Sequence, residues 1–193
     1  WGHPEYGALG HGTTGVYIRE GGKGAKEMYE CILKPAQIVK YVKKDGKTQR
    51  VTHEYAASEI KVRCVAAGKN HSVLVEEWEG SNHYNRVFTF GMGAYGRLGH
   101  AWSHDELFPR ELVSFSEYNR DSGEIGMPLR NRSVRKIICG GCVTLAGVES
   151  GGMYHWGKMA NAARGEATMY PTFIIDMATM EVDPERVCCG SSN

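Results

Sequence analysis

The sequence is poor in proline and carries almost no net charge. Proline accounts for 6 of the 193 residues and glycine for 25. This balance excludes a collagen-like chain or a proline-rich linker, and it is typical of short strands joined by tight turns. With 23 basic and 22 acidic residues the formal net charge is +1. No global field therefore attracts nucleic acid or an anionic membrane, so such binding would need a local patch.

Long apolar runs and strong helical periodicity are also missing. No run approaches the ~18 residues that span a membrane, and the chain does not open on a signal peptide, so we expect no membrane partner. Most of the cysteines lie inside apolar stretches such as 62–66 and 187–189, where they resemble small buried hydrophobic residues. We therefore expect an intracellular, reducing location.

What the sequence does contain is a repeat. Residues 1–11 and 90–100 share one skeleton: an aromatic residue and glycine, four further residues, then Gly-x-Leu-Gly-His. A weaker third copy begins at Trp156. Recurrence of this kind predicts a solenoid or propeller built from similar units.

A second landmark alternates with the first. Two small residues or cysteines precede a glycine in each of three segments, 65–68, 137–140 and 187–190. A proline follows each aromatic-Gly copy, at Pro35, Pro109 and Pro171. The intervals are unequal, which indicates inserts at 78–85 and 118–130.

The segments between these landmarks have the texture of strands. Residues 71–75 and 86–90 are short and rich in β-branched and aromatic side chains, and residues 134–138 alternate apolar with polar. We expect an all-β protein in which Leu98 and the aromatic residue before Gly91 fill the space between neighbouring units.

The repeat resembles that of the regulator-of-chromosome-condensation family. The resemblance rests on Gly68-x-x-His71-Ser72, Phe90-Gly91 and Gly96-x-Leu98-Gly99. The chain is further similar to the second-paralogue branch of that family, the telophase-disc proteins. That similarity is carried by residues 1–11, 95–100 and 168–171, and by the long insert that ends at Cys31.

The resemblance implies a partial β-propeller, about three blades of a seven-bladed ring, each blade a four-stranded antiparallel sheet. We expect one propeller domain over 1–193, with most of one blade at 1–39, a second at 62–113, a third at 134–175 and the start of another at 187–193. A propeller hides its sheet edges by closing the ring, and three blades cannot close. The expected protein is therefore longer than this chain.

The family's founding member is an exchange factor for a small GTPase, with acidic and histidine side chains in its Gly-x-x-His loops. The matching positions here form the expected partner-binding face: Lys69, Asn70, His71, Gly141, Cys142, Ser191 and Ser192. None is acidic, which argues against the founding member's activity. His71 has an alternative interpretation as a half-buried histidine bonded to backbone.

The leading hypothesis is thus a non-catalytic binding platform for small GTPases or for chromosomal and spindle components, located in the nucleus, on chromosomes and in the cytoplasm. The alternative is a guanine-nucleotide exchange factor. We expect no catalytic residue, cofactor or metal ion in the chain itself.

Two small clusters invite a metal or catalytic hypothesis. Cys139-x-x-Cys142 lacks the second ligand pair that a structural zinc site needs. His100, His104 and Asp105 follow a turn closely enough to suggest a metal site or dyad, but we favour a solvated loop on the rim of a blade.

Basic residues gather in two inserts. One patch comprises Lys43, Lys44, Lys47 and Arg50, preceded by Lys40; the other comprises Arg130 and Arg132, followed by Arg135 and Lys136. Either could contact acidic partner loops or nucleic-acid phosphates, or could simply be a solvated face. Aromatic residues are not interleaved with them, so base stacking on single strands is unsupported.

Overall fold

The computed structural model describes residues 1–21, 24–77, 85–112, 116–118, 125–128, 133–148, 152–159, 166–176 and 187–190. These residues form an all-β structure, as expected, with strands joined by turns and by three 3-10 helices: η1 (Glu5–Gly7), η2 (Ala57–Glu59) and η3 (Ala94–Gly96). Each of these described helices is a single turn and far too short to cross a bilayer.

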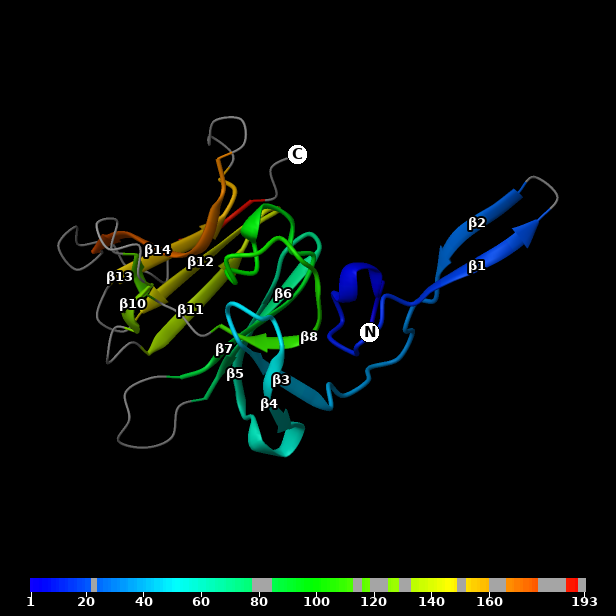
Figure 1. Ribbon diagram of the computed structural model, residues 1–193, viewed down its shortest axis with the longest axis horizontal. Coiled ribbons are helices and arrows are strands. Elements are labelled where there is room, and N and C mark those ends of the chain that lie inside the picture. The colour runs from blue at the N-terminus through cyan, green and yellow to red at the C-terminus, as the bar shows by residue number, and fades with distance from the viewer. Residues whose placement is uncertain are drawn as a thin grey trace.

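The larger of two main sheets has the strand order β4-β3-β8-β7-β6-β5 (Figure 1). Its strands are β3 (Lys40–Lys44), β4 (Val51–Ala56), β5 (Val62–Ala67), β6 (His71–Glu76), β7 (Val87–Gly91) and β8 (Glu106–Glu111). Strands β5 to β8 form an antiparallel meander, whereas β3 joins β8 in parallel through the pair Val42 and Arg110.

This sheet has six strands, where the sequence led us to expect four. The additional hairpin, β3–β4, adds to the β8 edge because its apolar side chains pack on the sheet. Tyr41 is 5% exposed, and its ring centre lies 5.1 Å from that of Phe88. The ring of Tyr55 approaches the same phenylalanine at 6.1 Å. Residues 40–56, expected to be an insert, are therefore an integral part of the sheet.

The second main sheet contains the four antiparallel strands β11 (Val134–Cys139), β12 (Val143–Val148), β13 (Gly152–Gly157) and β14 (Thr168–Asp176). Its β11 strand packs against β5 and β6 of the larger sheet. The core between the sheets is built from β-branched and aromatic side chains, chiefly Val73, Val75, Val87, Val134, Val148, Tyr154 and Trp156.

The two glycine-rich repeat loops each pack on the sheet that follows them in the chain. The Gly12 amide donates a hydrogen bond to the Leu107 carbonyl at 2.9 Å, and the Ala101 amide donates to the Met169 carbonyl at 2.8 Å. The approach is close: a Cβ atom on Gly96 would lie 2.8 Å from the Met169 Cα. Leu98 is fully buried and Phe90 is 3% exposed, which confirms the expected filling between units.

Two further hairpins extend from this framework. Strands β1 (Val16–Gly21) and β2 (Gly24–Tyr29) pair with each other and project away from both sheets (Figure 1). At the base of this hairpin Gly2 forms a β-bridge with Ile32. Strands β9 (Ser116–Tyr118) and β10 (Ile125–Pro128) pair with each other. β10 lies within the expected insert at 118–130, and β9 ends at the first residue of that insert.

The expected blades at 1–39 and 187–193 stay predictions. Residues 1–39 contribute η1, the β1–β2 hairpin and one bridge, and 187–190 contain no described strand. Residues 191–193, and 78–84 of the expected insert at 78–85, lie outside the described part of the chain.

Candidate functional site

The Gly-x-x-His turn of the larger sheet, Gly68–His71, lies beside the matching turn of the second sheet, Gly140–Val143, where valine stands in place of the histidine. A backbone hydrogen bond of 2.8 Å closes each turn. The Gly68 amide donates to the His71 carbonyl, and the Gly140 amide donates to the Val143 carbonyl. The Lys69 amide reaches across to the Gly140 carbonyl at 3.4 Å. The fold thus brings Lys69, Asn70 and His71 together with Gly141 and Cys142; Ser191 and Ser192 lie outside the described residues.

His71 does not face a partner, contrary to its place in the expected binding face. It is 1% exposed, and its Nε2 lies 2.9 Å from the Thr144 hydroxyl of the other sheet. That hydroxyl donates its single proton to the Arg97 carbonyl at 3.1 Å, so His71 Nε2 is the donor to Thr144. The alternative interpretation of His71 as a structural histidine also needs correction, because the side chain is fully buried rather than half-buried and its hydrogen bond goes to a side chain rather than to backbone.

The buried His71 predicts a pH-dependent stability. Burial, with a smaller contribution from the Arg97 charge, lowers its pKa to about 4. The unfolded chain binds this proton more readily, so the stabilisation is complete above pH ~6.5 and is lost as the pH falls from there toward 4. We expect roughly 3 kcal/mol of unfolding free energy to depend on this group.

Urea unfolding of the whole protein between pH 4 and 7 checks this expectation. The loss of stability toward acid should be shallower in His71→Gln, which cannot bind the proton. The matched control, His104→Gln, removes an exposed imidazole. Identical slopes in the two variants would show that His71 does not control the transition.

Arg97, which we did not single out from the sequence, holds the turns in place. It is 2% exposed and donates to the Ala94 and Gly141 carbonyls at 2.8 and 3.1 Å. Its guanidinium also donates to the Cys142 Sγ atom at 3.3 Å. Gly141 and Cys142 are therefore contacts of a structural arginine, and Lys69 remains exposed beside them.

Two tyrosines on these loops share an uncommon backbone conformation. Tyr6 and Tyr95 occupy the same place in the two repeat copies and have φ values of 60° and 61°. A bulky residue in this left-handed region is strained and is kept there only by its surroundings. Tyr95 is 49% exposed, and the Lys158 Nζ atom lies 5.4 Å from its ring centre. Comparing the two copies with each other could have revealed this pair.

Carboxylates also approach this surface, although none comes from the turns Gly68–His71 and Gly140–Val143. Glu5 precedes Tyr6, and its hydrogen bond and charge raise the pKa of the tyrosine hydroxyl. Asp105 accepts a bond from Gly93 N at 2.8 Å. We use the term turn face for the surface around Lys69, Tyr95, Asp105 and Lys158. It offers an aromatic ring and charges of both signs, a chemistry suited to contact with another protein.

The other candidate clusters are dispersed by the fold. His100 is half-buried, and its Nε2 donates a hydrogen bond to the Thr89 hydroxyl at 2.8 Å. His104 is exposed, and the Asp105 carboxylate accepts a hydrogen bond from the Gly93 amide. Burial raises the pKa of the Cys139 thiol to about 12. The Cys142 Sγ atom instead accepts a hydrogen bond from Arg97, so the two cysteines do not act as a pair. Within the described ranges, no three histidine, cysteine or acidic side chains converge as metal ligands would.

The first basic patch is divided between scaffold and surface. Lys44 Nζ lies 2.5 Å from the buried Glu106 carboxylate, and Lys43 Nζ lies 3.5 Å from Glu111. These two lysines fasten β3 to β8, which corrects their assignment to a free patch. Lys47 and Arg50 stay exposed. Arg130 and Arg132 lie outside the described residues.

Comparison with known proteins places these features in a family. Residues 84–146 match the regulator of chromosome condensation (RCC1) repeat. The whole chain is 32% identical over 195 residues to Protein RCC2 homolog of Danio rerio and to Protein RCC2 of Mus musculus. The chain belongs to the RCC1-repeat family. It covers 33% and 32% of these two relatives, so it spans about a third of their length.

RCC1-repeat proteins of known structure are also similar. A crystal structure of Prp20p from Saccharomyces cerevisiae, described with its binding properties to Gsp1p and histones, superposes with a TM-score of 0.49 at 15% identity. That match covers 75% of this chain and 33% of Prp20p.

Proposed function

We propose that this chain is about three blades of a seven-bladed β-propeller that serves as a non-catalytic binding platform. Membership of the RCC1-repeat family supports the ring, and the two main sheets, packed through β5 and β11, would be consecutive blades. The blades would follow the boundaries 62–113 and 134–175, with partial blades at 1–39 and 187–193.

The proposed partner of the turn face is a small GTPase, with chromosomal or spindle proteins as further partners. The observation that carries this proposal is the row of adjoining turns beside the exposed Tyr95. Arg97 fixes these turns from beneath, so little conformational freedom is lost when a partner binds. A role in the nucleus, on chromosomes and in the cytoplasm rests on the family alone.

Guanine-nucleotide exchange is the second candidate. An exchange factor must disturb the nucleotide phosphates and their Mg²⁺ ion, and carboxylates suit that task. The two adjoining turns supply no carboxylate, but Asp105 brings one to the same surface. Asp105→Asn keeps an oxygen for the Gly93 amide while it removes the charge, so it tests this role without disturbing the loop.

The test is retention of nucleotide-free small GTPases by the immobilised whole protein, with nucleotide release measured in parallel. We expect Lys69→Ala/Tyr95→Asn to weaken retention about tenfold, because asparagine tolerates the left-handed backbone while the exposed ring and charge are lost. Tyr17→Asn/Arg19→Ala on the β1–β2 hairpin is the matched control. Release that falls in Asp105→Asn identifies exchange; no retention of any GTPase contradicts the proposal.

A further inference from the structure

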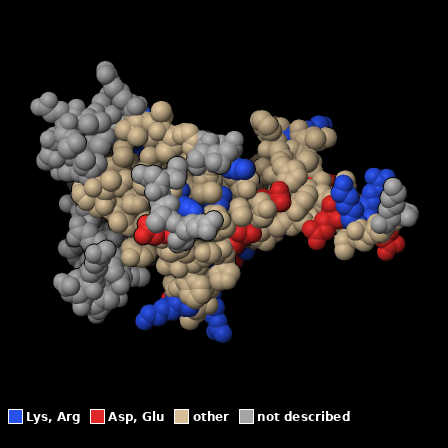
Figure 2. Space-filling model, turned by 90° about the horizontal axis from the view of Figure 1, so that it is seen from above, with Lys and Arg blue, Asp and Glu red and all other residues tan. Residues whose placement is uncertain are grey.

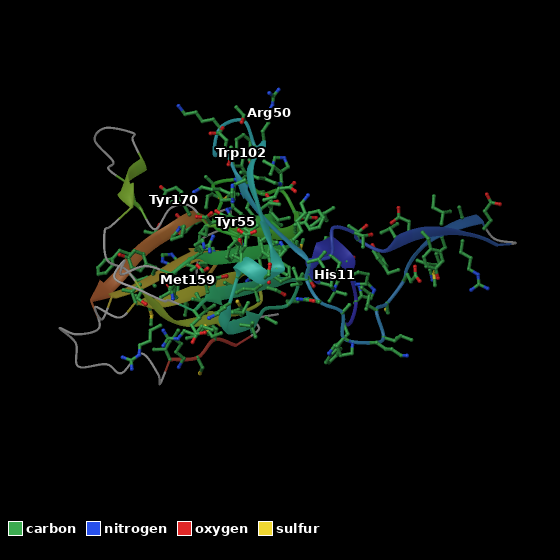
Figure 3. The ribbon with its side chains drawn as sticks, turned by 90° about the horizontal axis from the view of Figure 1, so that it is seen from below. His11, Arg50, Tyr55, Trp102, Met159 and Tyr170 are labelled. Atoms are coloured by element: carbon green, nitrogen blue, oxygen red, sulfur yellow. The ribbon has the colours of Figure 1, made fainter. Side chains whose placement is uncertain are left out.

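The turn between β3 and β4 carries two exposed cations, and neither forms a salt bridge with another residue in the described ranges. Lys40, Lys43 and Lys44 are all paired, with Glu54, Glu111 and Glu106 respectively. Lys47 and Arg50 at the turn are exposed, and neither is ion-paired within the part of the chain that the structure describes. Figure 2 shows basic side chains projecting alone at one edge of the molecule, and Figure 3 places Arg50 at the end of this hairpin.

Trp102 lies directly beside this turn, although it is distant in sequence. Its indole Nε1 donates to the Gly46 carbonyl at 3.1 Å, and its ring centre lies 5.6 Å from that of His104. The side chain is still 40% exposed. Figure 3 labels both Trp102 and Arg50 at this end of the molecule, where Trp102 is bonded to the turn through Gly46. The fold therefore places a partly exposed aromatic side chain beside the cations of this turn.

Trp102 is not part of the repeat skeleton. The first copy has Gly12 and Thr13 where the second has Ala101 and Trp102. Ala101 adopts a φ of 61°, close to the 78° of Gly12, so the non-glycine residue is held in a left-handed conformation directly before the tryptophan. Packing of the repeat accounts for the shared glycines and leucine, but it does not call for an indole here.

The turn is held rigid by side chains rather than left flexible. The Asp45 carboxylate accepts hydrogen bonds from the Lys47 and Thr48 amides and from the Thr48 hydroxyl. Gln49 donates to the Gly46 carbonyl at 2.7 Å and accepts from the buried Arg110 at 2.8 Å. A turn that is already ordered loses little conformational entropy on binding.

From these features we infer that Lys47, Arg50 and Trp102 form a docking site for an acidic protein segment. Carboxylates of the segment would pair with the two exposed cations, and an apolar side chain would cover the exposed indole face. Tryptophan and arginine are the residues that most often dominate such contacts. Two cations on a chain of net charge +1 give few phosphate contacts, so the charge favours a short acidic segment over nucleic acid.

This site goes beyond the proposed function because it names a second surface with its own partner chemistry. Its residues are separate from those of the turn face. The variants below should leave GTPase retention unchanged, so either proposal can fail without the other.

The test uses a fluorescein-labelled peptide of alternating Glu and Gly with one central Phe, titrated with the whole protein. We expect Lys47→Gln/Arg50→Gln and Trp102→Ala each to weaken binding about tenfold or more. Trp102→Phe, which loses the indole N–H but keeps a ring, should retain most of the affinity. Far-ultraviolet circular dichroism and thermal melting show that each variant is folded.

The matched control is Arg19→Gln/Lys26→Gln, which removes the same charge from the β1–β2 hairpin and should change binding less than about twofold. A thymidine oligonucleotide of equal charge is the competing probe. Tighter binding of the oligonucleotide that depends on the same three residues would replace the acidic segment with nucleic acid. Equal peptide affinity for all variants, or no affinity at all, would overturn the site.

Discussion

Replacing Trp156 with alanine is expected to lower the free energy of unfolding by about 3–5 kcal/mol. This indole is fully buried between the two main sheets. A Cβ atom on Gly99 would lie 3.1 Å from the Trp156 Cδ1 atom, so the repeat loop already packs tightly against the ring. Deleting the ring would leave a cavity that strands of two sheets and a rigid loop cannot fill.

Urea unfolding of the whole protein measures this effect, and Trp1→Ala is the matched control. Trp1 is 71% exposed, so the same substitution there should change stability by no more than about 0.5 kcal/mol. Similar losses in both variants would mean that burial between the sheets is not what Trp156 contributes.

Replacing Glu106 with alanine is expected to cost about 3–5 kcal/mol. Its carboxylate lies 2.5 Å from Lys44 Nζ and 2.7 Å from Arg110 Nη1, and both the glutamate and the arginine are 3% exposed. The variant leaves two cations without their counter-ion at the junction of β3 and β8, one of them fully enclosed. Removing one partner of a buried ion pair lowers the free energy of unfolding by more than the intact pair contributes to it, because the remaining charge is left buried and unpaired.

Denaturant unfolding and amide hydrogen exchange together test this role. Exchange should accelerate over residues 40–56, because the β3–β4 hairpin loses its ionic anchor. Glu54→Ala is the control, because it breaks the ion pair of Glu54 with Lys40, two side chains that are 54% and 35% exposed. It should lower the free energy of unfolding by no more than about 1 kcal/mol. Unchanged exchange in the hairpin of Glu106→Ala would show that the apolar contacts of Tyr41 and Tyr55 hold it without help.

Sequence reasoning was strongest where the chain repeats itself. Leu98 and Phe90 could be assigned to the interior because an apolar residue that keeps a fixed distance from recurring glycines is expected to pack between the units. Their burial depends on local turn geometry, which the repeat encodes within about ten residues. Gly96 and Gly99 have positive φ values of 69° and 76°, which is part of the same local turn conformation that the repeat predicts.

Contacts between distant segments could not be derived in this way. Lys43, Lys44, Lys47 and Arg50 look like one patch in sequence, but Glu106 and Glu111 arrive from a strand some sixty residues later and separate them. Trp102 meets Gly46 only because β3 adds beside β8. Such pairings are set by tertiary packing, and they cannot be predicted from the periodicity and composition of a short segment.

Each repeat loop packs on the sheet that follows it in the chain, so each sheet depends on a segment that precedes it. The η1 loop packs on β7 and β8 of the six-stranded sheet, and the η3 loop packs on β13 and β14 of the four-stranded one. A lesion in η1 would thus expose Leu107 and weaken the six-stranded sheet, and a lesion in η3 would weaken the four-stranded one. Structural damage is expected to spread from the N-terminal side toward the C-terminal side, so the order of the units along the chain is also their order of dependence.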